Sequence, residues 1–267
     1  MFYAGRVSEE FLKTGKPAHL EYEAAGLRWL RDAAGATTVD VLGLDSSGLH
    51  LQRLDTGFES AAAAGQFGTA LAKTHAAGAP GWGAAPPSWH RTVANKGAMP
   101  MSVVPAVDLP STEAFGVWLI RERLAPMVRI ASDHGDLPAS MRQSFEKLYR
   151  LLQNGDFDSP QPAAVTAPAA RLHGDLWAGN LMWTRIGVVL IDPSAYGGHA
   201  ETDLAECGLF GTPYMSEIYA GYNAVSPLAA GWEERVALHR LYMLTLHLAL
   251  FGTGYLGSVA AILDCYV

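Results

Sequence analysis

The sequence contains very few cysteines. There are two among 267 residues, Cys207 and Cys265, which lie far apart and form no CxxC pair. Two thiols are too few for a disulfide framework, so the class of small secreted proteins that depend on one is excluded. We therefore expect both side chains to be buried free thiols in a reducing compartment.

Basic residues are also scarce. Lys and Arg number 19 against 26 Asp and Glu, which gives a formal net charge of −7. Binding to the phosphates of nucleic acids requires clustered positive charge, so we expect no nucleic-acid partner. A cationic or amine-bearing partner suits an acidic chain better.

Targeting and membrane signals are missing as well. The stretch MFYAGRVSEEF has neither the basic start nor the long apolar run of a signal peptide. Residues 241–263 are long enough to cross a bilayer, but Gly252, Gly254 and Gly257 interrupt them. We expect two buried helices joined by a turn at FGTGY, no membrane association and a cytoplasmic location.

The 49% hydrophobic content is enough for one large core or two unequal ones. Residue spacing predicts a small α+β unit made of a strand at 11–13, a helix at 19–35 and a strand at 48–54. Further helices are predicted at 61–77, 113–132 and 140–153, a hairpin at 180–192, and helices in the remainder. The Gly/Pro-rich residues 78–110 are interpreted as a loop that borders an acceptor pocket.

The stretch HGDLWAGN carries the strongest chemical signal. Asp175 lies two residues after His173, and Asn180 follows five residues after Asp175. The predicted hairpin places Asp192 at the end of an apolar strand, twelve residues beyond Asn180. An amide oxygen and a carboxylate brought together in this way can hold Mg²⁺ with bound phosphates, while Asp175 can accept a proton. This combination is typical of phosphoryl transfer.

A structural interpretation of the same residues exists. Asp175 and Asn180 are common turn residues, and Asp192 could simply end a strand before Pro193. HGDLWAGN followed at this distance by IDP and ETDLA specifies several residue types at fixed offsets, which favours the catalytic interpretation. Trp177, inside the motif, either stacks on a sugar or packs the loop.

With these residues in view, the chain resembles the fructosamine kinase (ketosamine 3-kinase) family, within the group of aminoglycoside phosphotransferases and protein-kinase-like enzymes. The resemblance lies in the blocks LHGDLWAGN, IDPSAYGGHAETDLAECGLFG and LHRLYMLTLHLALFGTGY, and extends upstream through FGVWLIRERL and FGTALAKTH. It implies that Asp175 is the catalytic base and that Asn180 and Asp192 bind Mg²⁺.

The resemblance also assigns roles in the amino-terminal part. FLK and EYEAAGLRWL are similar to the strand and helix whose lysine and glutamate form an ion pair at the nucleotide phosphates, which implies Lys13 and Glu23. LHLQRL is similar to the hinge strand, which places Gln52, Arg53 and Leu54 beside adenine through their backbone groups. An exposed lysine on an edge strand is the structural alternative for Lys13.

The residues before Lys13 depart from the family pattern. Family members place two strands and a phosphate-covering loop there. Twelve residues are too few to form all of these, although residues 1–7 could supply the end of one strand. We expect either a start upstream of Met1 or a shortened member with altered nucleotide binding.

Other polar residues receive structural interpretations. Asp203 followed by Glu206 resembles a capping box, with support of the catalytic loop as a second role for Asp203. His239 and His247 are expected to fill a helical interface rather than bind zinc, and His173 to fix its loop by hydrogen bonding.

These observations predict a bilobal protein-kinase-like α+β fold, with a small and apparently truncated nucleotide-binding lobe at 1–55 and a mostly helical catalytic lobe at 56–267. The resemblance implies ATP- and Mg²⁺-dependent phosphorylation of a sugar hydroxyl, the 3-hydroxyl of a free or protein-bound ketosamine. Two alternatives stay open: phosphorylation of an aminoglycoside or another small molecule, and a pseudokinase or binding module. The sequence does not indicate an oligomeric state.

Overall fold

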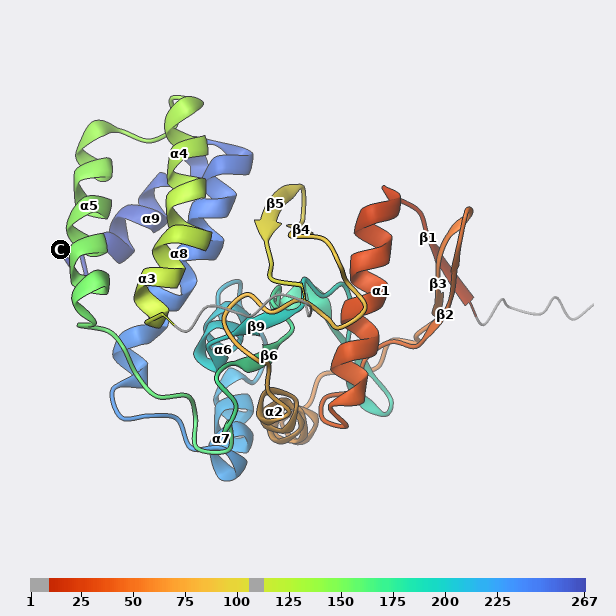
Figure 1. Cartoon of the computed structure of the whole chain (residues 1–267). Helices are drawn as coiled ribbons and strands as arrows, with labels where there is room; N and C mark the ends of the chain where they lie inside the picture. The colour runs from red at the N-terminus through yellow and green to blue at the C-terminus, as the bar shows by residue number, and fades with distance from the viewer. Residues whose placement is uncertain (1–9, 106–112) are drawn as a thin grey trace, which may run out of the picture.

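The computed structural model describes residues 10–105 and 113–267. A sheet with one long helix lies at one end of the molecule and a group of helices at the other, with smaller sheets between them (Figure 1). This arrangement confirms the predicted α+β class. The strand end predicted within residues 1–7 lies outside the described residues.

The sheet at the amino-terminal end has the antiparallel order β1-β3-β2. Its strands are β1 (Glu10–Lys13), β2 (Val41–Asp45) and β3 (Gly48–Gln52), and α1 (Pro17–Asp32) packs on it. Leu20 and Leu27 of α1 are buried against Leu49 and Leu51 of β3, as the helical spacing of apolar residues predicts. Strand β2 is not predicted from the sequence, because Gly43 and a register shift break its alternation of residues.

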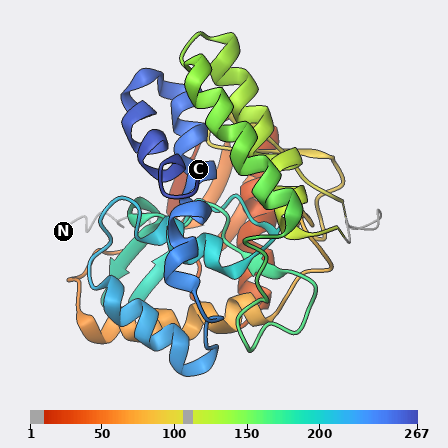
Figure 2. The same ribbon diagram turned by 90° about the vertical axis from the view of Figure 1, so that its left-hand side faces the viewer.

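Helices α2 (Ala61–Ala76) and α7 (Met215–Val225) lie side by side on the opposite side of the molecule from the helical group (Figure 2). Glycine permits this close contact. A Cβ atom on Gly68 would lie 2.0 Å from the carbonyl oxygen of Ile218. The two helix backbones therefore touch where Gly68 faces α7.

The interpretation of residues 78–110 as a loop is wrong in part. Strands β4 (Val93–Lys96) and β5 (Met99–Ser102) form a hairpin there, which lies between α1 and the helical group (Figure 1). The four-residue strands contain Asn95, Lys96 and Pro100, so they lack the β-branched alternation that marks a strand. Gly97, with φ of 57°, makes the turn.

The helical group confirms the predicted helices. It contains α3 (Phe115–Leu119), the π-helical segment η1 (Ile120–Leu124), α4 (Ala125–Asp133), α5 (Ala139–Asn154), α8 (Trp232–Phe251), the 3₁₀ turn η3 (Thr253–Tyr255) and α9 (Leu256–Leu263). The turn at FGTGY thus separates α8 from α9, as expected. Among the described residues, no helix combines the length and apolar character that a membrane crossing requires.

The middle of the molecule holds two short antiparallel pairs of strands. The predicted hairpin is formed by β7 (Leu181–Thr184) and β8 (Gly187–Leu190), directly after the 3₁₀ turn η2 (Ala178–Asn180). The second pair, β6 (Ala170–Leu172) and β9 (Tyr196–Gly198), precedes α6 (Ala200–Cys207). Strand β9 lies where helix was predicted, because a three-residue Tyr-Gly-Gly strand carries no periodicity.

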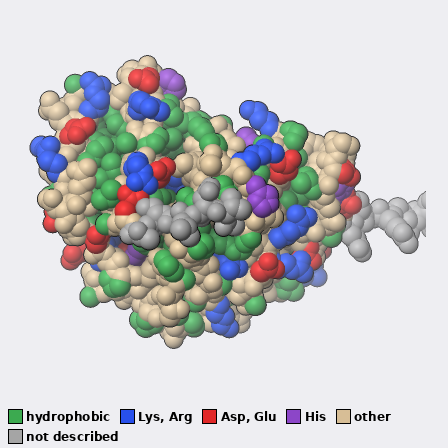
Figure 3. Space-filling model, in the orientation of Figure 1, with side chains coloured by type: hydrophobic (Ala, Val, Ile, Leu, Met, Phe, Trp, Pro, Cys, Tyr) green, Lys and Arg blue, Asp and Glu red, His purple; other side chains and the backbone are tan. Residues whose placement is uncertain are grey.

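Charged side chains are spread over one face of the molecule (Figure 3), and the two cysteines differ in burial. On the face shown in Figure 3, Lys and Arg side chains are dispersed among acidic and neutral ones. Cys207 is a buried free thiol, as predicted. The prediction is wrong for Cys265, which is exposed because it follows α9 near the carboxyl end of the chain.

Candidate active site

The loop between β6 and η2 is fixed by buried hydrogen bonds. The carboxylate of Asp203 accepts from the backbone N–H groups of His173 (2.7 Å) and Gly174 (2.9 Å), and it contacts His75. Gly174 has φ of 77°, and a Cβ atom there would lie 2.2 Å from the carbonyl oxygen of Ser194. Glycine is therefore required at the residue before Asp175.

The capping-box interpretation of Asp203 is wrong. Helix α6 begins at Ala200 with His199 as its N-cap, so Asp203 lies inside the helix and is fully buried. Burial alone would raise the pKa of Asp203, but its contacts with His75, His173 and Gly174 lower it below the usual value. The second role predicted for Asp203 is confirmed in its structural part, since these contacts support the loop that carries Asp175.

His173 also holds the loop, as expected. Its Nε2–H donates to the carbonyl oxygen of Ile191 at 2.9 Å, and its Nδ1 accepts from the backbone N–H of Asp175 at 3.3 Å. One ring nitrogen donates and the other accepts, as in a neutral imidazole, and burial lowers the pKa of His173 in favour of this form. The loop is thereby tied to the end of strand β8.

Asp175 and Asn180 contact each other directly. The side-chain amide of Asn180 donates to the carbonyl oxygen of Asp175 at 2.7 Å and to its Oδ2 atom at 3.0 Å. Both bonds use the nitrogen of Asn180, which leaves the amide oxygen as the atom that can bind a cation. The local motif therefore places a possible base beside a possible metal ligand.

Asp192 lies at the end of β8 and meets residues from the amino-terminal sheet. Its backbone has φ of 53°, a left-handed conformation that is uncommon for a residue other than glycine and is frequent at functional sites. Its Oδ1 atom is 2.8 Å from Nζ of Lys13, and the same ammonium group is 2.7 Å from Oε2 of Glu23. The Lys13–Glu23 pair expected from the sequence is thus present.

These side chains surround one cavity of about 360 Å³, which we call the central cavity. Its walls include six of the predicted site residues: Lys13, Glu23, Asp175, Trp177, Asn180 and Asp192. Thr14, Gly15, Lys16, Asn95 and Gly97 also line it. Its size lies within the range of small-ligand pockets.

The three residues expected beside adenine do not line the central cavity. Gln52 ends strand β3, where its backbone N–H donates to Asp40, and Leu54 packs beside the α1–β3 core. Gln52 and Arg53 are exposed. The structure therefore brings six of the nine predicted site residues together at one cavity and leaves these three outside it.

Lys96 is a buried neighbour of Asp175 that the sequence did not predict. It is fully buried on β4, 2.8 Å from both carboxylate oxygens of Glu206 and 3.7 Å from Oδ1 of Asp175. The signal available in the sequence was weak, a lone lysine before a glycine in a Gly/Pro-rich stretch. Its neighbours Asn95 and Gly97 confirm that this stretch borders the cavity.

Aromatic rings extend from the central cavity across the surface. Trp177 contacts Phe210 edge to face at 6.0 Å between ring centroids, and Phe210 lies 5.4 Å from His247. His247 in turn contacts Phe251 (5.5 Å) and Tyr255 (5.0 Å). We call these five residues the aromatic surface. His247 thus lies half-buried among rings near the α8–α9 turn.

Comparison with known proteins identifies the family. The fructosamine kinase family model matches residues 105–267. The crystal structure of a protein assigned as a fructosamine-3-kinase from Thermobifida fusca YX-ER1 has 34% sequence identity and a TM-score of 0.82, over 95% of this chain and 81% of that chain. The chain belongs to the fructosamine kinase family.

Two further proteins are similar to this family member in sequence or in fold. A chloroplastic protein-ribulosamine 3-kinase from Arabidopsis thaliana is 35% identical over 150 residues, which cover 55% of this chain and 42% of the plant protein. The ADP-bound aminoglycoside phosphotransferase APH(2'')-Ib shares the fold, with a TM-score of 0.60 at 13% identity over 96% of this chain and 86% of that chain. The predicted protein-kinase-like fold is therefore confirmed. The chain spans about half the length of the curated relatives it matches.

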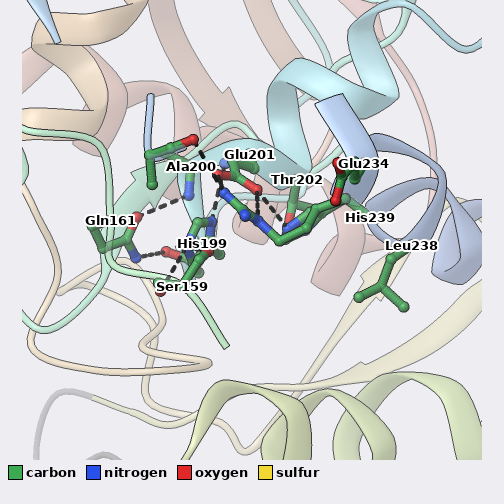
Figure 4. Close-up of polar contacts among 12 residues, drawn as sticks. Ser159, Gln161, His199, Ala200, Glu201, Thr202, Glu234, Leu238 and His239 are labelled. Atoms are coloured by element: carbon green, nitrogen blue, oxygen red, sulfur yellow. Dashed lines mark hydrogen bonds and ion pairs between the residues drawn. The ribbon is translucent and has the colours of Figure 1, made fainter. Parts of the chain in front are cut away.

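Outside the central cavity, the fold of this family member brings His199, Glu201 and His239 together (Figure 4). Their ligand atoms lie within 4.8 Å of one another, a proximity that the sequence did not reveal. Each atom already has a partner. Glu201 binds Arg235 with both oxygens at 2.6 and 2.9 Å, and His239 contacts Thr202 and Glu201.

His199 is equally occupied. Its Nδ1 accepts from the backbone N–H of Glu201, and its Nε2 contacts Ser159. Burial lowers the pKa of His199 to about 3, so the ring is neutral. The cluster is satisfied by hydrogen bonds and one ion pair, and it joins the 159–161 segment to α6 and α8 (Figure 4).

Proposed function

We propose that this protein catalyses ATP-dependent phosphorylation of the 3-hydroxyl of a ketosamine. The observation that carries the proposal is the convergence of Asp175, Asn180, Asp192 and Lys13 on one cavity in a chain of the fructosamine kinase family. The names of the relatives support it, since they describe a fructosamine-3-kinase and a protein-ribulosamine 3-kinase. Both names specify the same position on a ketose that is joined to an amine.

The amino-terminal part would hold the nucleotide, with a lobe boundary near residue 55. Lys13 is positioned by Glu23 and Asp192 and would bind phosphate oxygens, as a lysine does in related phosphoryl transfer sites. An ADP-bound structure with the same fold supports the binding of an adenine nucleotide by a protein of this fold. ATP is therefore the proposed phosphoryl donor.

Two residues fit the requirements of Mg²⁺. Asn180 keeps its amide oxygen available because its nitrogen binds Asp175, and the partly exposed carboxylate of Asp192 lines the same cavity. Oxygen ligands of this kind suit Mg²⁺, which generally retains several waters and phosphate oxygens. When bound, the ion would offset negative charge on the phosphates.

The acceptor side is assigned to Asp175 and the aromatic surface. The carboxylate of Asp175 would orient the acceptor hydroxyl and accept its proton, since it lines the cavity on the fixed loop. Trp177 is 37% exposed beside it and would pack against the sugar ring or its amine substituent. An amine-bearing sugar therefore matches this wall and the acidic character of the chain.

Purified protein tests the proposal directly. We expect transfer of phosphate from ATP to low-molecular-weight fructosamines and ribulosamines, with the product phosphorylated at the 3-hydroxyl by NMR. A panel of aminoglycosides is the comparison, and we expect none to be phosphorylated. Turnover of aminoglycosides alone would replace the proposed substrate class. Failure to bind nucleotide in a calorimetric titration would instead identify a non-catalytic binding module.

A further inference from the structure

The hairpin β4–β5 inserts a positive charge beneath the candidate base. Lys96 and Glu206 are 1% and 0% exposed, and two contacts of 2.8 Å join them. Glu206 lies on α6, the helix that also carries Asp203. The pair therefore links the hairpin to the helix that supports the Asp175 loop.

The charge state of this pair follows from its geometry. Burial alone would lower the pKa of Lys96, but the carboxylates of Glu206 and Asp175 raise it above the usual value. Burial raises the pKa of Glu206 and so favours the neutral form of this carboxyl group as well. Because both oxygens of Glu206 contact the same ammonium group, we assign an ion pair with a charged Lys96.

A buried ion pair is weak evidence for stability. Removing two charges from water costs free energy that their attraction recovers only in part, and an apolar pair of similar volume is often as stable. Tyr242 adds a ring contact at 5.2 Å from Lys96 Nζ, and the same ring lies 5.7 Å from Arg123. The ammonium group is therefore held in place by a carboxylate and an aromatic ring.

The two oxygens of Asp175 have different neighbours. Oδ1 is 3.7 Å from Nζ of Lys96, and Oδ2 accepts from Asn180 at 3.0 Å. The carboxylate thus lies between a cation that comes from the hairpin and an amide that comes from its own loop. Rotation of the carboxylate would lose at least one of these contacts.

We propose that Lys96, held by Glu206, is a positioning residue that fixes the carboxylate of Asp175 for the acceptor hydroxyl. This role rests on the proposed function and extends it to a residue in the hairpin. Lys96 acts through Asp175 and is too deeply buried to bind the acceptor itself. Replacing the whole pair should therefore reduce turnover without changing the binding of ATP.

The double variant Lys96→Met/Glu206→Met separates positioning from folding. Each single substitution would leave an uncompensated buried charge, whereas the double variant replaces the pair with apolar side chains of similar length. We expect a kcat at least tenfold below wild type, a KM for ATP within twofold and a cooperative thermal transition. A folded double variant with wild-type kcat would overturn the proposal.

A second ion pair on α6 is the matched control. Glu201 and Arg235 are buried and joined by two contacts like Glu206 and Lys96. Arg235 lies on α8, however, and the pair contacts His239 and a backbone carbonyl group where Lys96 contacts Asp175. Arg235→Met/Glu201→Met should keep wild-type kcat in its folded fraction. If both double variants lost activity equally, loss of any buried pair would explain the result and the positioning role would be wrong.

Crystal structures of wild type and the double variant provide a readout without substrate. A changed or disordered Asp175 side chain in the variant supports the role of Lys96 even if wild type phosphorylates no ketosamine, in which case only the proposed function fails. An unchanged Asp175 overturns the positioning role even if kcat falls. If the Met pair does not fold, Lys96→Gln/Glu206→Gln removes both charges, retains a polar contact and takes the same two measurements.

Discussion

Lys13 and Asp192 form an ion pair across the central cavity, with 2.8 Å between Nζ and Oδ1. The same ammonium group also binds Glu23, so one positive charge faces two carboxylates. Burial, together with the nearby Asp192 carboxylate, raises the pKa of Glu23 to about 7 despite the attraction of Lys13. Glu23 therefore titrates near neutral pH, and a divalent cation bound near Asp192 would offset the negative charge that the two carboxylates carry when ionised.

The first prediction concerns this cation. Asp192→Ala should abolish Mg-ATP-dependent turnover, because it removes the only carboxylate of the proposed ligand pair. Asn180→Ala should raise the Mg²⁺ concentration for half-maximal rate by about tenfold. Initial rates over a range of Mg²⁺ at saturating ATP measure both effects. Asp40→Asn is the control, since Asp40 forms an exposed ion pair with Arg31 outside the cavity. Unchanged Mg²⁺ dependence in both site variants would indicate that the β7–β8 hairpin has only a structural role.

The second prediction concerns the base. Asp175→Asn should lower kcat by at least about a hundredfold and leave ATP affinity nearly intact, because in the proposed mechanism Asp175 acts on the acceptor and not on the nucleotide. Isothermal titration with a non-hydrolysable ATP analogue measures binding, and the rate of ketosamine phosphorylation measures turnover. A folded variant with near-normal rate would remove Asp175 from the mechanism. Loss of nucleotide binding would assign it a different role.

The third prediction concerns the aromatic surface. Trp177→Ala should raise the KM for the acceptor by about tenfold, because one aromatic contact contributes about this factor to binding. The KM for ATP should be unchanged. Trp177→Phe should retain part of the affinity. Phe58→Ala serves as control, since Phe58 is 96% exposed and does not line the central cavity. Equal acceptor KM values in wild type and Trp177→Ala would show that Trp177 only packs the loop and does not bind the acceptor.

The predicted residues that line the cavity lie close together in the sequence or in blocks that resemble the family. Asp175, Asn180 and Asp192 are joined by a short loop and a two-stranded hairpin, so their spacing in sequence determines their proximity. Lys13 and Glu23 are predicted because the strand and the following helix that carry them resemble the corresponding blocks of the family. Local spacing and family resemblance are sufficient for such residues.

Lys96 could not be predicted in the same way. Its partner Glu206 lies on a helix that is distant in sequence, and the strand that carries it has no apolar alternation. Asp203 was misinterpreted for a related reason, since its acceptor role depends on the backbone of a loop that only the folded chain brings near. Long-range contacts of single polar residues leave no periodic pattern.

The fourth prediction follows from the pKa of Glu201. Burial would raise this pKa, but His239 and Arg235 lower it to about 2, below its value in the unfolded chain. The stability that Glu201 contributes is therefore complete above about pH 4.5 and is lost as pH falls towards 2. Between pH 7 and pH 3.5, wild type should lose about 1 kcal/mol more unfolding free energy than Glu201→Gln.

Urea unfolding of the two proteins at both pH values measures this difference. Wild type and Glu201→Gln share every other titrating group, so these groups cancel to first order in the comparison. The variant should be less stable at pH 7, because Arg235 remains buried without a charged partner. An equal loss of stability in both proteins on acidification would show that Glu201 is not held ionised by its neighbours.

The last prediction uses two glycines three residues apart on α2. A Cβ atom on Gly68 would lie 2.0 Å from the carbonyl oxygen of Ile218, whereas on Gly65 the nearest atom outside the helix, the carbonyl oxygen of Glu217, would be 3.8 Å away. Gly68→Ala should thus force α2 and α7 apart and cost about 2 kcal/mol or more of unfolding free energy. Gly65→Ala should stabilise the protein by up to about 1 kcal/mol, because alanine favours the helix. Urea unfolding of both variants measures the two changes, and a loss of similar size in each would contradict the close contact of α7 at Gly68.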